Sequence, residues 1–330
     1  MKECFSGHVT IVRGSIEAIN FDSSDSVYKW LYAKTYTYKD FSFAGVLSEL
    51  KKRSGKKIAV LLPSLNEEKT VGKVITTAKE VQEIGLIDEL ILIDSNSSDK
   101  TVQIAKNAGI PTYIHQEIRK DLGSYEGKGE AMYKSAYITD ADILIWVDTD
   151  IESITPSFFY GLIGPLLTNP ELRFVKGFFE RPVDIRSNGI ELGGGRVTEL
   201  LMKPWINLHM PELSGFIQPL SGTVAIYRED FLQMKIPVNY GVEIAMLLQM
   251  NKRKGICSIC QVNLGTVIHK SKDVMALSDM SFQILQTLDF FSGQKSSNST
   301  YRKVYTRDSN FQIVSKKHEF IIREFKDPLS

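Results

Sequence analysis

The chain has 330 residues, of which 43% are hydrophobic and 24% are charged. This is the composition of an ordinary globular protein, and it excludes a disordered or fibrous chain. The 40 basic and 39 acidic residues nearly cancel, so no net positive charge draws the chain to nucleic acid or to a membrane surface.

The length of the apolar runs and the number of cysteines indicate the cellular location. No apolar stretch reaches the roughly 18 residues that span a bilayer, and the first residues do not read as a signal peptide. Three cysteines are too few for a disulfide framework and fit a reducing compartment. We therefore expect a cytoplasmic protein, and we interpret Cys257 and Cys260 as packing residues rather than as a zinc or redox site.

The first half of the chain alternates strands with helices. After residues 1–55 and a basic run at 51–57, which we interpret as a solvated linker rather than a phosphate site, apolar runs predict strands separated by helices. The strands are expected over 58–62, 90–93, 111–115 and 143–147, with helices over 67–83, 97–109 and 127–137. This order predicts an α/β fold whose parallel sheet carries helices on both faces. Ligands of such sheets bind beyond the carboxyl ends of the strands.

Strands and helices alternate less regularly in the second half of the chain. Helices are expected over 156–167, 196–207, 241–250 and 273–291, and strands over 174–179, 218–227 and 256–268. The remainder, 292–330, is polar and is expected to form a tail or a clamp.

Polar residues follow the first two predicted strands. The first strand runs into Pro63-Ser64-Leu65-Asn66-Glu67-Glu68, and the second into Asp94-Ser95-Asn96-Ser97-Ser98-Asp99. At the carboxyl edge of a parallel sheet these groups can hydrogen-bond a base or a ribose. Acidic residues and caps at the start of a helix explain the same pattern, so both interpretations stay open.

Two aspartates follow the fourth strand. Asp148 and Asp150 are separated by one residue, so in an extended chain they point the same way. Two carboxylates on one side repel each other unless a positive charge lies beside them, and oxygen ligands suit Mg²⁺ or Mn²⁺. We interpret this pair as a metal site that neutralises a diphosphate.

Two glycine-rich segments precede helices. Gly127-Lys128-Gly129 is similar to a phosphate-binding P-loop only superficially, because Gly129 stands where that loop needs Ser or Thr, so a P-loop ATPase is excluded. Lys128 is expected to reach a nucleotide phosphate or the sugar. The run Gly193 to Thr198 places Arg196 at a helix start, which we interpret as an anion cradle rather than a hinge.

These motifs in this order resemble the glucosyl-3-phosphoglycerate synthase family, which are retaining glycosyltransferases of the GT-A fold. The resemblance covers roughly residues 27–292. The stretches most specific to this family are the triple-glycine segment with Arg196, and the helix start Gly241-Val242-Glu243 with the following strand and His269. The other matching stretches are Leu62 to Glu68, Asp94 to Asp99, Gly127 to Ala131, Asp148 to Asp150, Gln218 to Gly222 and Gln261 to Gly265.

The resemblance implies a role for each site residue. The donor, UDP-glucose, is bound by Pro63, Leu65, Glu67, Ser95, Lys128 and Asp148. The acceptor, 3-phosphoglycerate, is bound by Gly195, Arg196, Thr198 and Ser271. The cofactor, Mg²⁺ or Mn²⁺, is held by Asp150 and His269, and the catalytic residues are Glu243, Asp150 and Lys128. At Ser271 the chain departs from the asparagine that the family tends to carry.

The resemblance also implies an activity and an organisation. The expected reaction moves glucose from UDP-glucose to the 2-hydroxyl of 3-phosphoglycerate with retention of configuration, in a homodimer. We assign 1–55 to an N-terminal extension, 56–151 to a nucleotide-sugar-binding lobe, 152–292 to an acceptor-binding lobe and 293–330 to a tail. The alternatives are a GDP-mannose-dependent synthase with the same acceptor, and a non-catalytic nucleotide-sugar sensor. A nucleotidyltransferase is disfavoured, because no glycine occurs between Pro63 and Val71.

Overall fold

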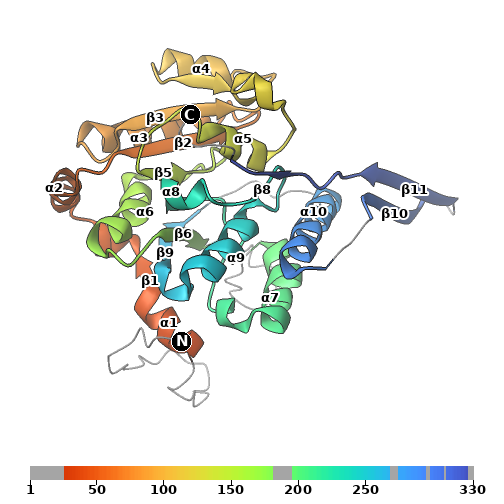
Figure 1. The fold of residues 1–330 in the computed structure, drawn as a ribbon. Helices are drawn as coiled ribbons and strands as arrows, with labels where there is room; N and C mark the ends of the chain where they lie inside the picture. The colour runs from red at the N-terminus through yellow and green to blue at the C-terminus, as the bar shows by residue number, and fades with distance from the viewer. Residues whose placement is uncertain (1–25, 181–194, 268–273, 295–297, 308–309, 326–330) are drawn as a thin grey trace, which may run out of the picture.

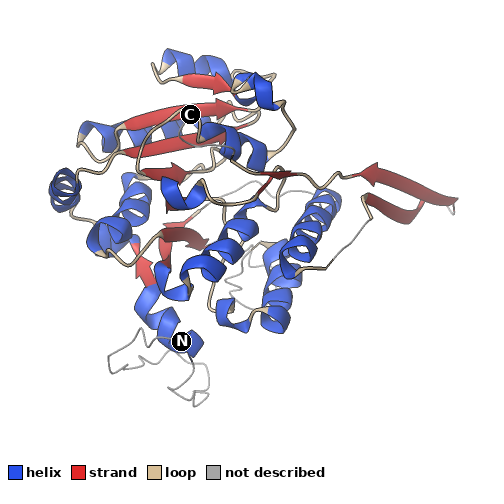
Figure 2. Ribbon diagram, in the orientation of Figure 1, coloured by secondary structure: helices blue, strands red, loops and turns tan. Residues whose placement is uncertain are grey.

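The computed structural model describes residues 26–180, 195–267, 274–294, 298–307 and 310–325. Their centre is an eight-stranded sheet with the strand order β1-β9-β6-β7-β5-β2-β3-β4, and helices cover both of its faces (Figure 2), as predicted. The strands are β1 Thr35–Thr37, β2 Ile58–Ser64, β3 Glu89–Asp94, β4 Thr112–Ile114, β5 Ile143–Trp146, β6 Phe174–Glu180, β7 Val224–Tyr227 and β9 Ile259–Thr266. The α-helices are α1 Ser26–Lys34, α2 Ala44–Ser54, α3 Val71–Glu83, α4 Thr101–Asn107, α5 Lys128–Ser135, α6 Pro156–Thr168, α7 Lys203–His209, α8 Arg228–Phe231, α9 Val242–Lys254 and α10 Val274–Ser292.

Strand β2 shows how the sheet divides the core. Its alternate residues Ile58, Val60 and Leu62 pack in one apolar layer with α3 and α6. Ala59 and Leu61 face the other layer, which includes α5, α7, α9 and α10. Since successive side chains of a strand point to opposite faces, a continuous apolar run is what a strand covered on both faces requires.

The sheet is mixed rather than parallel throughout. Strand β7 is antiparallel to both of its neighbours, β5 and β6, whereas the pairs β2–β3, β2–β5, β3–β4 and β6–β9 are parallel. The parallel sheet predicted from the first half of the chain is confirmed for β2, β3, β4 and β5. The sequence carried no direction for β7, because a short apolar run indicates burial and not strand direction.

Two helices begin later than expected, and the reason is the same for both. Helix α3 starts at Val71 rather than residue 67, and α4 at Thr101 rather than residue 97. The preceding loops are tied to each other, with Glu67 N donating to Thr101 Oγ1 at 2.8 Å and Glu68 N to Asp99 Oδ2 at 3.0 Å. Long-range bonds between loops thus replace the first helical turns that the periodicity predicted.

Two segments of the second half also differ from expectation. Only Val224–Tyr227 of the predicted strand 218–227 is extended, because Ser221 N donates to Gln218 O at 3.0 Å and closes a turn. The predicted helix 196–207 contains a π-helical turn at Thr198–Met202 before α7. Strand β9 starts after a 3₁₀ turn at Ile256–Ser258, later than predicted.

Both ends of the described chain join the body. Strand β1 pairs with β9 at the edge of the sheet, and the Trp30 indole of α1 donates to the carbonyl of Ile259 at 3.1 Å. At the other end, β10 Thr300–Arg307 and β11 Asn310–Lys317 form a hairpin that projects beyond α10 (Figure 1). The chain then returns to α5, where β12 Ile322–Arg323 pairs with β8 Ile236–Pro237. None of the helices in the described ranges combines the length and the apolarity needed to cross a membrane.

Candidate active site

The loops that follow β2 and β3 form one rigid edge of the sheet. Asn66 N donates to Ser97 Oγ at 2.9 Å, and Ser98 N donates back to Asn66 Oδ1 at 2.8 Å. Asn66 and Asn96 have φ values of 57° and 68°, a left-handed conformation that asparagine tolerates better than most residues. The two predicted donor-binding segments therefore lie side by side.

The predicted donor residues of these loops are accessible. Pro63, Glu67 and Ser95 are half-buried, while Leu65 is 53% exposed. An apolar side chain held in the open at the carboxyl edge of a sheet offers a flat contact for a base. Below it, the fully buried Asp94 accepts bonds from Ser97 N at 2.7 Å and Ser97 Oγ at 2.6 Å, which fixes the second loop.

Three predicted residues meet at the next position along this edge. Lys128, the first residue of α5, forms ion pairs with Asp148, which follows β5, and with Glu243 Oε1 of α9 at 3.0 Å. The side chains of Lys128 and Glu243 are only 17% and 8% exposed, whereas that of Asp148 is 28% exposed. The structure thus gathers one cation and two carboxylates from three elements far apart in sequence.

The charge of Lys128 is secured by these neighbours. Burial lowers the pKa of the Lys128 ammonium, but the adjacent carboxylates of Asp148 and Glu243 together outweigh it and hold the pKa above its usual value. Lys128 is therefore a fixed cation at neutral pH.

A turn of the second half closes against this cluster. At Gly222 an added Cβ would overlap Lys128 Nζ and would lie 2.8 Å from Asp148 Oδ2. Only a residue without a side chain allows the backbone to approach these groups so closely. The turn 218–223 belongs to the site for this reason, although the sequence suggested a strand.

Lys176 of β6 is a site residue that the sequence reasoning missed. It is 1% exposed, and its Nζ donates to the carbonyl of Ser221 at 2.9 Å, beside Gly222. Burial lowers the pKa of Lys176 to about 7, and the positive charge of Lys128 adds to this effect. The carboxylate of Glu243 acts in the opposite direction but does not outweigh them. The sequence contains a sign of this role, since a lysine interrupts the otherwise apolar run Phe174–Phe179.

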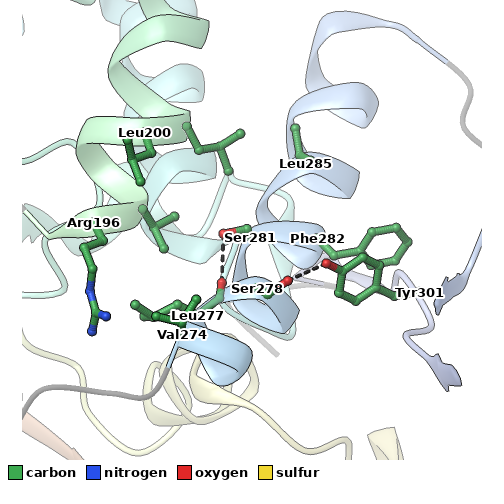
Figure 3. A pocket seen from close by; sticks show the side chains of 11 residues that line it. Arg196, Leu200, Val274, Leu277, Ser278, Ser281, Phe282, Leu285 and Tyr301 are labelled. Atoms are coloured by element: carbon green, nitrogen blue, oxygen red, sulfur yellow. Dashed lines mark hydrogen bonds between the residues drawn. The ribbon is translucent and has the colours of Figure 1, made fainter. Parts of the chain in front are cut away.

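The predicted acceptor residues lie on another segment. Thr198 is buried and Arg196 is exposed at the start of the helical segment that continues into α7. Arg196 lies at one end of a cavity of about 360 Å³, which is otherwise lined mainly by apolar residues of this segment and of α10. Its guanidinium points away from these apolar side chains (Figure 3). Gly195 precedes it, while Ser271 is outside the described residues.

Asp150 is the predicted metal ligand that the structure describes. Asp150 is half-buried two positions after Asp148, and carboxylate oxygens are the ligands that Mg²⁺ and Mn²⁺ prefer. In the described part of the chain no three His, Cys, Asp or Glu side chains gather into a metal site. The other predicted ligand, His269, lies outside the described residues.

The expectation that Cys257 and Cys260 are packing residues holds at Cys260 and is wrong at Cys257, which is disulfide-bonded. Cys260 is fully buried in β9, and burial raises the pKa of its thiol. A protonated thiol in an apolar layer packs as a small hydrophobic group.

Known proteins are similar to this chain in sequence and in fold. Residues 59–232 match glycosyl transferase family 2. The glucosyl-3-phosphoglycerate synthase of Petrotoga mobilis is 43% identical over 257 residues, which cover 77% of this chain and 79% of that protein. The crystal structure of glucosyl-3-phosphoglycerate synthase from Mycobacterium tuberculosis with Mn²⁺, UDP and glucosyl-3-phosphoglycerate has a TM-score of 0.79 at 32% identity, covering 88% of this chain and 97% of that chain.

A relative whose name specifies another sugar has the same fold. Mannosyl-3-phosphoglycerate synthase from Rubrobacter xylanophilus has a TM-score of 0.82 at 30% identity, covering 90% of this chain and 96% of that chain. The predicted GT-A fold is confirmed by these structures. The extent and level of identity to the glucosyl enzymes decide the family. The chain therefore belongs to glycosyl transferase family 2, and within it to the glucosyl-3-phosphoglycerate synthase family.

Proposed function

We propose that this enzyme transfers glucose from UDP-glucose to the 2-hydroxyl of 3-phosphoglycerate with retention of configuration. The observation that carries the proposal is the Lys128 ammonium, held between Asp148 and Glu243 at the carboxyl edge of the sheet. Such a site matches the chemistry of a nucleotide sugar, whose leaving diphosphate gains negative charge as the glycosidic bond breaks. Family membership supplies the identity of both substrates.

The donor end is assigned to the paired loops and to Lys128. Leu65 and Pro63 contact the uracil, while Glu67 and Ser95 bind the uridine through hydrogen bonds. Asp148 orients Lys128 and contacts the nucleotide. Because Lys128 is already charged and partly dehydrated, it stabilises the departing diphosphate without reorganisation.

The metal cofactor is assigned to Asp150 and His269. A bound Mg²⁺ or Mn²⁺ would act there as a Lewis acid that neutralises the diphosphate. Structures of the Mycobacterium tuberculosis relative hold Mn²⁺ or Mg²⁺ together with UDP, which supports the same choice here.

The acceptor end is assigned to Gly195, Arg196, Thr198 and Ser271. The planar guanidinium of Arg196 suits a carboxylate or a phosphate through two parallel hydrogen bonds. The Thr198 hydroxyl and the amide of Gly195 add donors for the remaining oxygens. Glu243 lies near the transferred glucose, where it holds Lys128 and orients the acceptor hydroxyl, whose proton passes to the departing diphosphate oxygen.

The test is a matrix of donors and acceptors with the purified full chain. UDP-glucose and GDP-mannose are each combined with 3-phosphoglycerate and with glycerate, with Mg²⁺, Mn²⁺ or EDTA, and the product is identified by mass spectrometry and by the NMR coupling of its anomeric proton. We expect an α-glucosyl product from UDP-glucose and 3-phosphoglycerate, and no turnover with EDTA. Transfer from neither donor to 3-phosphoglycerate would refute the proposal, and transfer from GDP-mannose alone would favour the mannosyl alternative.

The alternative of a sensor without catalysis is disfavoured, because the named relatives are synthases. Such a protein needs the nucleotide-binding loops but has no use for Arg196 and Thr198. The wild-type assay separates the two, since a sensor binds UDP-glucose without turnover, whereas an enzyme shows turnover that a Lys128→Met variant loses. We further propose that the enzyme is a homodimer and that it works in the cytoplasm. Light scattering of the purified protein measures its molar mass and tests the dimer.

A further inference from the structure

The last described residues of the chain cross the molecule and reach the helix that carries Lys128. We call residues 318–325 the C-terminal strap. It leaves β11 and runs to α5 (Figure 1), pairing on the way with β8, where Ile322 is opposite Pro237 and Arg323 is opposite Ile236. Val238 N also donates to Ile321 O at 3.2 Å. The strap is therefore part of the folded body rather than a loose end.

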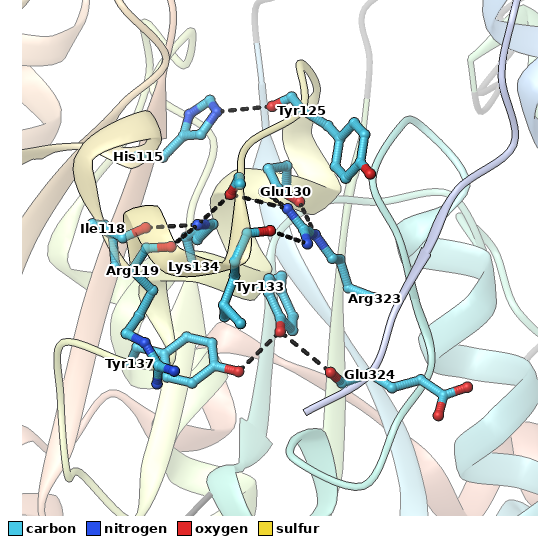
Figure 4. Close-up of polar contacts among 12 residues, drawn as sticks. His115, Ile118, Arg119, Tyr125, Glu130, Tyr133, Lys134, Tyr137, Arg323 and Glu324 are labelled. Carbon is cyan, nitrogen blue, oxygen red and sulfur yellow. Dashed lines mark hydrogen bonds and ion pairs between the residues drawn. The ribbon is translucent and has the colours of Figure 1, made fainter. Parts of the chain in front are cut away.

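Arg323 is the residue through which the strap grips α5. Its guanidinium makes a two-pronged ion pair with Glu130, Nε to Oε2 at 2.8 Å and Nη2 to Oε1 at 2.6 Å. It also donates to the carbonyls of Leu122 at 2.8 Å and Gly123 at 3.2 Å (Figure 4). The Arg323 guanidinium lies 4.6 Å from the ring centre of Tyr125. One side chain thus ties the loop before α5 to the first turn of α5.

Glu130 makes this contact strong. Its side chain is fully buried, while that of Arg323 is 12% exposed, and a buried carboxylate without a cation is costly. Lys134, the other nearby cation, donates instead to three carbonyls, those of Ile118, Arg119 and Gly123, at 2.6, 2.8 and 2.7 Å. Arg323 is consequently the cation that makes direct contact with the Glu130 carboxylate.

The first turn of α5 is also pressed against the strand that pairs with the strap. Glu130 N donates to Val238 O at 2.9 Å, and an added Cβ at Gly129 would overlap the carbonyl of Pro237. Glu130 is two positions after Lys128, in the same helical turn. The strap therefore fixes this turn twice, once through β8 and once through Arg323.

We propose that Arg323 is a positioning residue for the donor end of the active site. By holding Glu130 and the carbonyls of the preceding loop, Arg323 sets the position of the α5 N-terminus, and with it the placement of Lys128 against Asp148 and Glu243. This inference rests on the proposed role of Lys128 toward UDP-glucose. Arg196 and Thr198 lie on a different segment, so the KM for 3-phosphoglycerate should change less than the KM for UDP-glucose.

The test compares Arg323→Met, Arg323→Lys and the control Glu324→Gln in the full chain. Glu324 is the neighbouring residue of the strap, and its carboxylate pairs with Lys235 at 2.9 Å on the surface, so this variant should behave as the wild type. Kinetics with each substrate varied are combined with UDP affinity by calorimetry and with the melting temperature. Since displacements of about 1 Å in a site can cost about 100-fold, we expect R323M to lower kcat/KM for UDP-glucose at least about tenfold.

The split between the two substrates identifies a positioning role. R323M should weaken UDP binding while the KM for 3-phosphoglycerate changes less than about threefold, and R323K should recover part of the loss, because it retains the charge without the second prong. A folded R323M with wild-type donor kinetics and UDP affinity overturns the inference, as does a KM for 3-phosphoglycerate that rises as much as the KM for UDP-glucose. If R323M does not fold, R323K decides by the same criteria.

A second arm tests the route through Glu130. If Arg323 acts through this carboxylate, Glu130→Gln should lower donor kcat/KM by itself, and the double variant R323M/E130Q should be less impaired than the two separate losses multiplied together. Losses that simply multiply would overturn the route. Failure of the wild type to transfer glucose refutes the proposed function instead, and the effect of R323M on UDP affinity still tests the inference.

Discussion

At the scale of single residues, the lysines Lys128 and Lys176 show that burial can accompany opposite shifts of the pKa. Lys128 touches two carboxylates, and its pKa is raised although burial lowers it. Lys176 donates to a carbonyl rather than a carboxylate, and burial lowers its pKa to about 7. Direct contact with an anion decides the direction of the pKa shift. The attraction between the ammonium and a carboxylate weakens as they move apart, whereas the cost of burying the ammonium does not depend on that distance.

The lowered pKa of Lys176 predicts a rise in stability with pH. Its pKa is about 7 in the folded chain, compared with 10.5 for an unperturbed lysine, so between these values the unfolded chain binds more protons than the folded chain. From pH 7 to pH 9, the unfolding free energy of the wild type should gain about 2 kcal/mol relative to Lys176→Met. Urea unfolding of both proteins at the two pH values measures this, and parallel pH curves would exclude a neutral Lys176.

Arg196 belongs to the same scale, since its guanidinium is proposed to bind the acceptor's anionic groups. Arg196→Ala should raise the KM for 3-phosphoglycerate by about tenfold or more, because a charge-assisted pair contributes about 1.5–3 kcal/mol, while the KM for UDP-glucose changes little. The control is Lys203→Ala, which removes a cation of the same segment that pairs with Glu199 at 2.7 Å. An acceptor KM that matches the control would remove Arg196 from the acceptor site.

At the scale of elements, the turn 218–223 closes the site by bringing backbone against side chains. At Gly222 the groups in the way of a Cβ are the ends of the Lys128 and Asp148 side chains, which can move. At Gly129 the obstacle is the carbonyl of Pro237, which is backbone and cannot yield cheaply.

The difference predicts two kinds of damage from the same substitution. Gly222→Ala should fold with a melting temperature near that of the wild type but lose about tenfold or more in kcat, because it displaces Lys128. Gly129→Ala should lose stability by a few kcal/mol. Gly45→Ala is the control, since nothing lies within 4 Å of its added Cβ. Thermal unfolding and initial rates test all three, and a fully active G222A would show that the turn is not part of the site.

The same elements show what the sequence could predict. Strands such as β2, and the meeting of Lys128, Asp148 and Glu243, follow from local apolar runs together with a family resemblance that aligns distant motifs. The late start of α3 could not be predicted, because Glu67 and Glu68 bond to residues of another loop. The roles of Lys176 and Arg323 depend on a carbonyl and a carboxylate that only folding brings near. Local patterns carry no information about such partners.

At the scale of the whole molecule, one continuous sheet joins the two halves of the chain. Strand β7 of the second half lies between β6 and β5, so strands of both halves share one core. The first described element takes part as well, since Trp30 is 1% exposed and lies 4.4 Å from Phe216 between ring centres.

This arrangement predicts that α1 stabilises the whole sheet. Trp30→Ala should cost about 3–5 kcal/mol of unfolding free energy, as large aromatic truncations in cores do, and it should do so in a single unfolding transition. Tyr32→Ala is the control on the same helix, because its side chain is 51% exposed. Urea unfolding followed by tryptophan fluorescence and by circular dichroism measures both, and a separate early transition would show that α1 is an independent appendage.

The position of β7 in the sheet also affects the order in which the chain can fold as it leaves the ribosome. Strands β2 to β5 can pair with one another as soon as they are made, but among the described strands β6 pairs only with β7 and β9, both of which are synthesised later. Until then an apolar strand has unpaired edges, the condition under which nascent chains aggregate or recruit chaperones. We expect translation between residues 180 and 266 to be the stage at which the nascent chain is most prone to aggregate.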